Sequence, residues 1–130
     1  MFLRFVVPEI DKDSEKELGV FQAIHKLRQS GALSDYEVEL DDQIDRWFDK
    51  NLRKPSRFTA AKPPFRSKKS RAISWFKDTA QEHVARVRPL AAILQSHGVS
   101  VRMLKTDRVG YVVHEDEYQI VAEPFAGEQY

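Results

Sequence analysis

Residues 99–123, VSVRMLKTDRVGYVVHEDEYQIVAE, are rich in β-branched and aromatic residues and contain two polar interruptions. This pattern predicts three short strands, at 99–105, 111–114 and 118–123. Because the connections between them are short, we expect the strands to pair as an antiparallel meander. Most of the sequence before this stretch has helical periodicity, so the stretch decides the fold class by adding a sheet to the helices.

Three helices are expected upstream of the meander. The first begins at Ser14, which can form a capping box with Glu17. The second covers 34–52 and has the same capping pattern followed by an apolar stripe. The third covers 73–97, and Pro89 in its middle predicts a kink or a break into two helices.

A short apolar strand, 2–7, precedes the helices and ends at Pro8. The expected fold is therefore α+β, with a four-stranded, mostly antiparallel sheet made of this N-terminal strand and the C-terminal three-stranded meander. Three helices pack on one face of that sheet. A chain of 130 residues fits a single domain, 1–130.

Composition excludes several classes of protein. The chain has no cysteine, so it contains no disulfide framework, zinc–thiolate site or cysteine nucleophile, which suits a reducing cytoplasm. The N-terminal strand carries Arg4 in its middle and lacks the continuous apolar core of a secretory signal. No apolar run is long enough to span a bilayer, so we expect a cytoplasmic protein without membrane contact.

Charge is divided into blocks along the chain, although 21 Lys and Arg nearly balance 20 Asp and Glu overall. Residues 53–71, here called the basic segment, hold eight bases and no acid. Residues 9–50 hold twelve acids and six bases, and residues 107–130 hold six acids and one base. The basic segment also contains three prolines and no periodic pattern, which predicts a loop within the domain.

The basic segment is the candidate binding site for RNA, single-stranded DNA or another polyanion. Its cations can follow a phosphate backbone, and aromatic rings within it and beside it can stack on bases. The predicted site consists of Arg53, Lys54, Arg57, Phe58, Lys62, Phe65, Arg66, Lys68, Lys69, Arg71 and Trp75.

Two other interpretations of the basic segment stay open. It is a solvated loop, or it contacts acidic residues of this chain or of a protein partner. In the second case the protein is an interaction module, for example a homodimer in which the acidic helical hairpin of one chain meets the basic segment of the other.

Enzymatic chemistry is a third hypothesis. His83 beside Glu82, or His114 beside the carboxylates at 115–117, could serve in acid–base catalysis, and the same acidic turn could hold a hard cation. A surface ion pair from Glu82 to Arg86 and a polar hairpin turn explain these residues equally well. Motifs for nucleotide binding and hydrolysis are absent, and the sequence assigns no catalytic residue, cofactor or metal.

Overall fold

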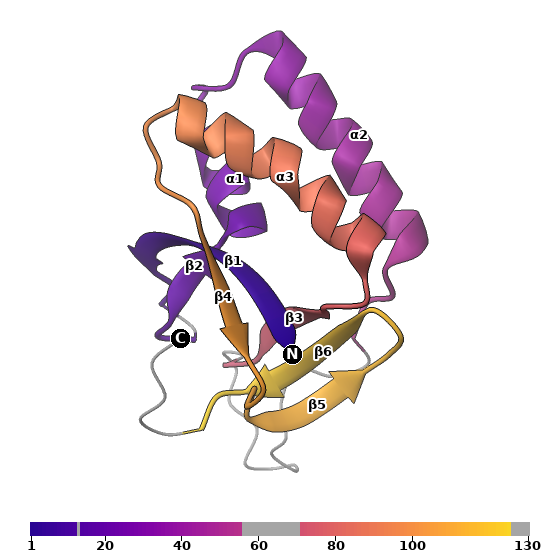
Figure 1. Ribbon diagram of the computed structural model, residues 1–130. Helices are drawn as coiled ribbons and strands as arrows, with labels where there is room; N and C mark the ends of the chain where they lie inside the picture. Colours follow the sequence, from indigo (N-terminus) through magenta and orange to yellow (C-terminus); the bar gives the residue numbers. More distant parts are fainter. Residues whose placement is uncertain (13, 56–70, 126–130) are drawn as a thin grey trace, which may run out of the picture.

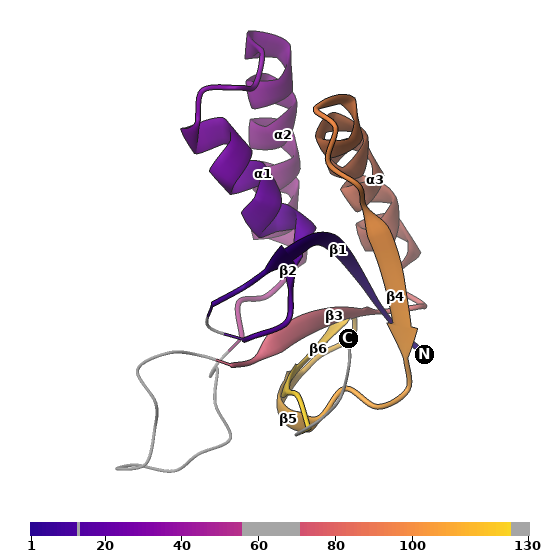
Figure 2. The ribbon, with the colours of Figure 1, turned by 90° about the vertical axis from the view of Figure 1, so that its left-hand side faces the viewer.

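The computed structural model describes residues 1–12, 14–55 and 71–125, and this part of the chain forms an α+β fold (Figure 1). In chain order the elements are β1 (Phe2–Ile10), β2 (Glu17–Gly19), α1 (Val20–Gln29), α2 (Asp35–Asn51), β3 (Ile73–Lys77), α3 (Gln81–Ser96), β4 (Arg102–Thr106), β5 (Tyr111–Glu115) and β6 (Gln119–Glu123). The three helices lie together on one side of the strands (Figures 1 and 2).

The strands form one six-stranded sheet in which every observed pairing is antiparallel. The order is β2-β1-β3-β6-β5, and β4 pairs with the opposite edge of β1. The sheet is strongly curved, so that β4 stands steeply against β3 in Figure 2. The α+β class and the mostly antiparallel sheet are thus confirmed.

The predicted four-stranded sheet is wrong in two respects. The sheet has six strands among the described residues, and the three C-terminal strands do not form a meander. β5 and β6 pair as a hairpin, but β4 pairs with β1, from Phe2 opposite Thr106 to Val6 opposite Arg102. The physical reason is that β1 pairs along both edges, with β4 on one and with β2 and β3 on the other. Pairings between segments far apart in the chain are not revealed by local turn geometry.

The predicted capping box at Ser14 is also wrong. Glu15 has a positive φ of 61°, and Ser14 instead donates its hydroxyl to the Asp11 carboxylate in the turn between β1 and β2. β1 continues through Pro8, which lies where the β1–β2 register shifts, between Val6 and Ile10. A proline lacks the N–H that a regular ladder requires, and it is tolerated at such an irregularity.

Residues 73–77 form a strand instead of the first turn of the predicted third helix. β3 lies between β1 and β6, pairing Leu3 with Phe76 and Ile120 with Trp75. A short apolar run fits helix and strand periods equally, so the partners on both sides decide its conformation. α3 then begins at Gln81 and continues through Pro89 as one helix, so the predicted break does not occur.

Two apolar clusters among the described residues hold the fold together. The larger joins all three helices to the sheet and includes Ile24, Phe48, Phe76 and Leu90. The second lies on the sheet around Trp75 and consists of Ile73, Trp75, Val109, Ile120 and Ala122. Within the described residues, no helix is both long and apolar enough to cross a membrane.

The second helix agrees with its prediction in detail. Ser34 accepts a hydrogen bond from the backbone N–H of Glu37 at 3.2 Å, and the Glu37 carboxylate accepts one from the Ser34 N–H at 2.9 Å. This capping box satisfies two backbone donors that a helix start otherwise leaves free. His97, at the end of α3, lies 3.0 Å from the Glu37 carboxylate and connects the two helices there.

Candidate functional site

The structure describes four of the eleven residues predicted to bind a polyanion. Arg53 and Lys54 follow the end of α2, Arg71 precedes β3, and all three side chains are exposed. The other seven lie outside the described residues: Arg57, Phe58, Lys62, Phe65, Arg66, Lys68 and Lys69.

Trp75 does not belong to an exposed binding surface. Its side chain is 1% exposed and packs in the second apolar cluster, between Ile73 and Ile120. The alternation of β3 directs Trp75 and Phe76 to opposite faces of the sheet, and both are buried there. The expectation that Trp75 stacks on a nucleic-acid base is therefore wrong.

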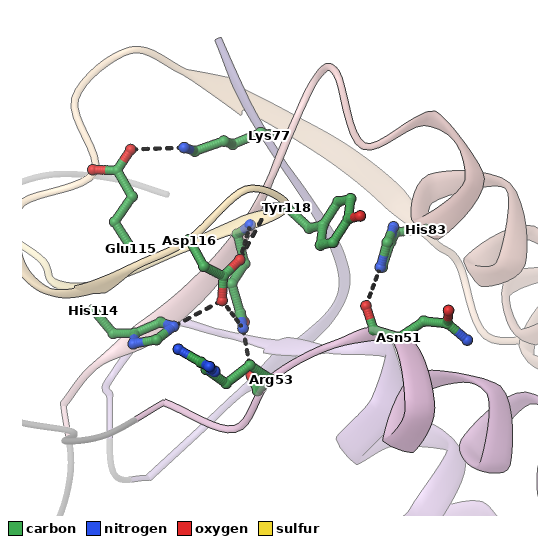
Figure 3. Close-up of polar contacts among 9 residues, drawn as sticks. Asn51, Arg53, Lys77, His83, His114, Glu115, Asp116 and Tyr118 are labelled. Atoms are coloured by element: carbon green, nitrogen blue, oxygen red, sulfur yellow. Dashed lines mark hydrogen bonds and ion pairs between the residues drawn. The ribbon is translucent and has the colours of Figure 1, made fainter.

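A hydrogen-bond network attaches the first residue of the basic segment to the β5–β6 turn (Figure 3). The Gln119 side-chain amide donates to the backbone carbonyl of Arg53 at 2.6 Å and to the Asp116 carboxylate at 3.0 Å. His114 Nε2 donates to the same carboxylate at 2.8 Å. The network fixes where the chain leaves α2, so the basic segment starts at a defined place.

Asp116 is the centre of this network. Besides the two side-chain donors, its carboxylate accepts hydrogen bonds from the backbone N–H groups of Tyr118 at 2.9 Å and Gln119 at 3.1 Å. Partial burial raises the pKa of Asp116, but the hydrogen bonds from His114 and from these donors outweigh it and lower the pKa to about 2. The carboxylate is thus charged at neutral pH.

The acidic turn does not gather its side chains around a common point. His114 and Asp116 bond each other, while Glu115 forms an ion pair of 2.8 Å with Lys77 on β3. These contacts fit a polar hairpin turn. Within the described residues, no group of three His, Cys, Asp or Glu side chains is placed to hold a metal ion.

His83 is buried among aromatic side chains next to the end of α2 (Figure 3). Its ring stacks on Tyr118 with centroids 4.2 Å apart and meets Trp47 edge to face at 4.8 Å. Its Nε2 lies 2.7 Å from the backbone carbonyl of Asn51, to which it donates. The imidazole therefore caps the last turn of α2. Glu82 does not contact His83 as an acid–base pair would; it forms an ion pair with Arg86 at 3.5 Å.

A cavity of about 570 Å³ lies where β1, β3, the start of α1 and the end of α2 meet. Arg53 and Lys54 line it, as does Gln119, so it adjoins the start of the basic segment. No histidine is among its described lining residues, which places His83 and His114 outside it. We therefore assign neither imidazole to catalysis.

Sequence reasoning missed Arg4, which also lines this cavity. Its side chain is 8% exposed and donates from Nη2 to the Glu17 carbonyl at 2.6 Å. Burial lowers the pKa of Arg4 to about 10, although Asp11 and Glu17 oppose that change. The pattern that could have revealed it is a single arginine within an otherwise apolar strand, because a buried charge requires a partner.

Comparisons with known proteins identify no relative. No family model matches the chain, and neither the curated proteins nor the solved structures contain a significant match. Function is therefore inferred from the residues and their geometry.

Proposed function

We propose that the chain is a cytoplasmic protein that binds RNA or single-stranded DNA through the basic segment. The observation that carries the proposal is the uninterrupted positive charge of residues 53–71, with eight bases and no acid. Such a run attracts phosphates and releases their counterions on binding. The absence of cysteine suits the reducing compartment in which such ligands occur.

Ion pairs within the described residues already occupy several acids between residues 9 and 50. These pairs join Glu9 with Lys26, Asp41 and Asp42 with Arg28, Glu17 with Arg102, and Glu37 with His97. Arg71 pairs with Glu15, but their charged atoms are 3.7 Å apart and both side chains are mostly exposed. An exposed pair of this kind contributes about 1 kcal/mol or less and leaves Arg71 accessible to phosphate.

In the expected mechanism, the Lys and Arg side chains of the basic segment bind the phosphates of the nucleic acid electrostatically. Trp75 is buried and does not stack on a base. The hydrogen bond from Gln119 to the Arg53 carbonyl fixes the position at which the basic segment begins. Eight phosphate contacts on a single strand would give a slope of about −6 in a plot of log affinity against log salt. Affinity should then fall roughly 10³-fold between about 50 and 200 mM salt.

Fluorescence anisotropy of short labelled single-stranded RNA and DNA tests this mechanism. The triple variant Lys68→Ala, Lys69→Ala and Arg71→Ala should flatten the salt slope by about 2, since three phosphate contacts are lost. A matched control removes the same charge from exposed helix positions, as Arg46→Ala, Lys50→Ala and Arg88→Ala. That control should leave the slope almost unchanged.

Two results would contradict the proposal. Absence of binding at about 50 mM salt would remove the polyanion function, because electrostatic affinity is greatest at low salt. An equal slope change in the control triple would show that net charge, and not the basic segment, determines binding. In the first case, sedimentation at the same two salt concentrations would test the homodimer in which acidic and basic regions meet.

A further inference from the structure

The cavity beside β1 contains a cation with an unused hydrogen-bond donor. Nη2 of Arg4 donates to the Glu17 carbonyl, but Nη1 is buried and meets no hydrogen-bond acceptor among the described residues. A buried donor without a partner is costly, and a guanidinium is suited to bind two acceptor oxygens. An acceptor from a ligand would satisfy it.

Helix α1 begins beside the Arg4 guanidinium. Its N-cap residue, Gly19, has no side chain to cap the helix, and its first turn contains no acid. A Cβ atom built on Gly19 would lie 3.8 Å from Nη2 of Arg4, so the helix start and the guanidinium are adjacent. The backbone N–H groups and dipole of a helix N-terminus favour an anion, as does the neighbouring positive charge.

Most of the exposed area of the rest of the cavity wall is apolar, although the carboxylates of Asp11 and Asp49 also belong to the lining residues. Phe21 and Phe48 meet edge to face with ring centroids 5.0 Å apart, and both line the cavity together with Leu52 and Trp75. A volume of about 570 Å³ is that of a typical small-molecule site. Such a wall excludes water from the hydrocarbon part of a ligand and strengthens its polar contacts.

We propose that this cavity binds a small amphipathic anion. A carboxylate or phosphate group accepts hydrogen bonds from Arg4 and from the start of α1, and a hydrocarbon body packs against Phe21, Phe48 and Leu52. Lys54 at the cavity border adds positive charge on the side of the basic segment. This small-molecule site is independent of the proposed polyanion function, and its test uses no nucleic acid.

Three probes of eight carbons each separate the charged group from the hydrocarbon: octanoate, octyl phosphate and octanol. Each is titrated to about 1 mM into ¹⁵N-labelled protein, a concentration that detects even weak specific binding. At least one of the two anions should bind tenfold or more tightly than octanol. Its resonance shifts should be greatest at Val20 and Phe21, and the stronger anion distinguishes a carboxylate from a phosphate ligand.

Paired arginine variants test the role of the guanidinium. Arg4→Met should reduce anion affinity tenfold or more, to the level of octanol. Arg88→Met removes the same charge from an exposed position of α3 outside the cavity lining, and should change affinity less than twofold. Circular dichroism establishes that each variant is folded.

The inference is overturned if neither anion shifts the cavity resonances at about 1 mM, or if octanol binds as tightly as both anions. It is also overturned if Arg88→Met weakens binding as much as Arg4→Met. Should Arg4→Met fail to fold, the comparison of anions with octanol on the unmodified protein decides the question by itself.

Discussion

Replacing Asp116 by Asn should destabilise the protein through loss of charge at the β5–β6 turn. Asn keeps one oxygen for the backbone N–H groups of Tyr118 and Gln119. In the place of the other oxygen it presents an amide donor toward the His114 ring and the Gln119 side chain, which are themselves donors. The two hydrogen bonds from the backbone N–H groups lose their charge assistance, and the two from the His114 and Gln119 side chains are replaced by contacts between donors.

The size of the effect follows from the pKa of Asp116, which is about 2 in the folded protein against an ordinary value of 3.8. A difference of this size corresponds to about 2 kcal/mol of stability at pH 7. Because folding lowers the pKa, this stabilisation is complete above about pH 5 and is lost as the pH falls toward 2. About half of it should remain near pH 3.

Urea unfolding followed by tryptophan fluorescence measures this effect, since buried Trp75 becomes exposed on unfolding. Asp116→Asn should lower the free energy of unfolding by about 2 kcal/mol at pH 7 and by about 1 kcal/mol near pH 3. Asp107→Asn is the matched control, because Asp107 is 76% exposed and pairs with the N-terminal amino group at 3.4 Å; it should cost less than about 0.5 kcal/mol. An equal loss at both pH values would refute the electrostatic explanation.

Two further substitutions test the backbone and the helix start. Gly110→Ala should destabilise by more than about 3 kcal/mol in thermal unfolding, because its φ is 122° and a Cβ there would lie 2.8 Å from the carbonyl carbon of Glu123. Gly98→Ala is its control, with φ of 80° and nothing within 4 Å, and should cost about 1 kcal/mol; similar losses for both would contradict the steric argument. Ser34→Ala should cost about 1 kcal/mol, whereas Ser30→Ala, which lies after α1 and caps no helix start, should cost little; equal effects would reject the capping assignment.

Local patterns in the sequence predicted some elements well. The Ser34 capping box, the β5–β6 hairpin and the end of α3 before Gly98 all depend on groups within a few residues of each other. Such contacts form in the same way whatever the rest of the chain does, so their residue patterns are informative. The division of charge that marks the basic segment is likewise a property of the sequence alone.

The candidate site was less predictable because its parts come from distant segments. Arg53 was expected at the start of the basic segment, but its anchoring by Gln119 joins positions 66 residues apart. The proximity of Trp75 to the basic segment in sequence predicts an exposed ring, whereas strand alternation buries it. Most of the predicted site lies outside the described residues, so its contact with a polyanion stays a prediction.

Residue types and short-range contacts are enough to predict the α+β class, the helix starting at Ser34, the C-terminal hairpin and the block of positive charge. Tertiary structure alone decided that β4 pairs with β1, that residues 73–77 form a central strand, and that Arg4 is buried beside the start of α1. Strand pairing joins segments that are far apart in the chain, and the same short apolar run is stable as helix or strand until its partners are in place.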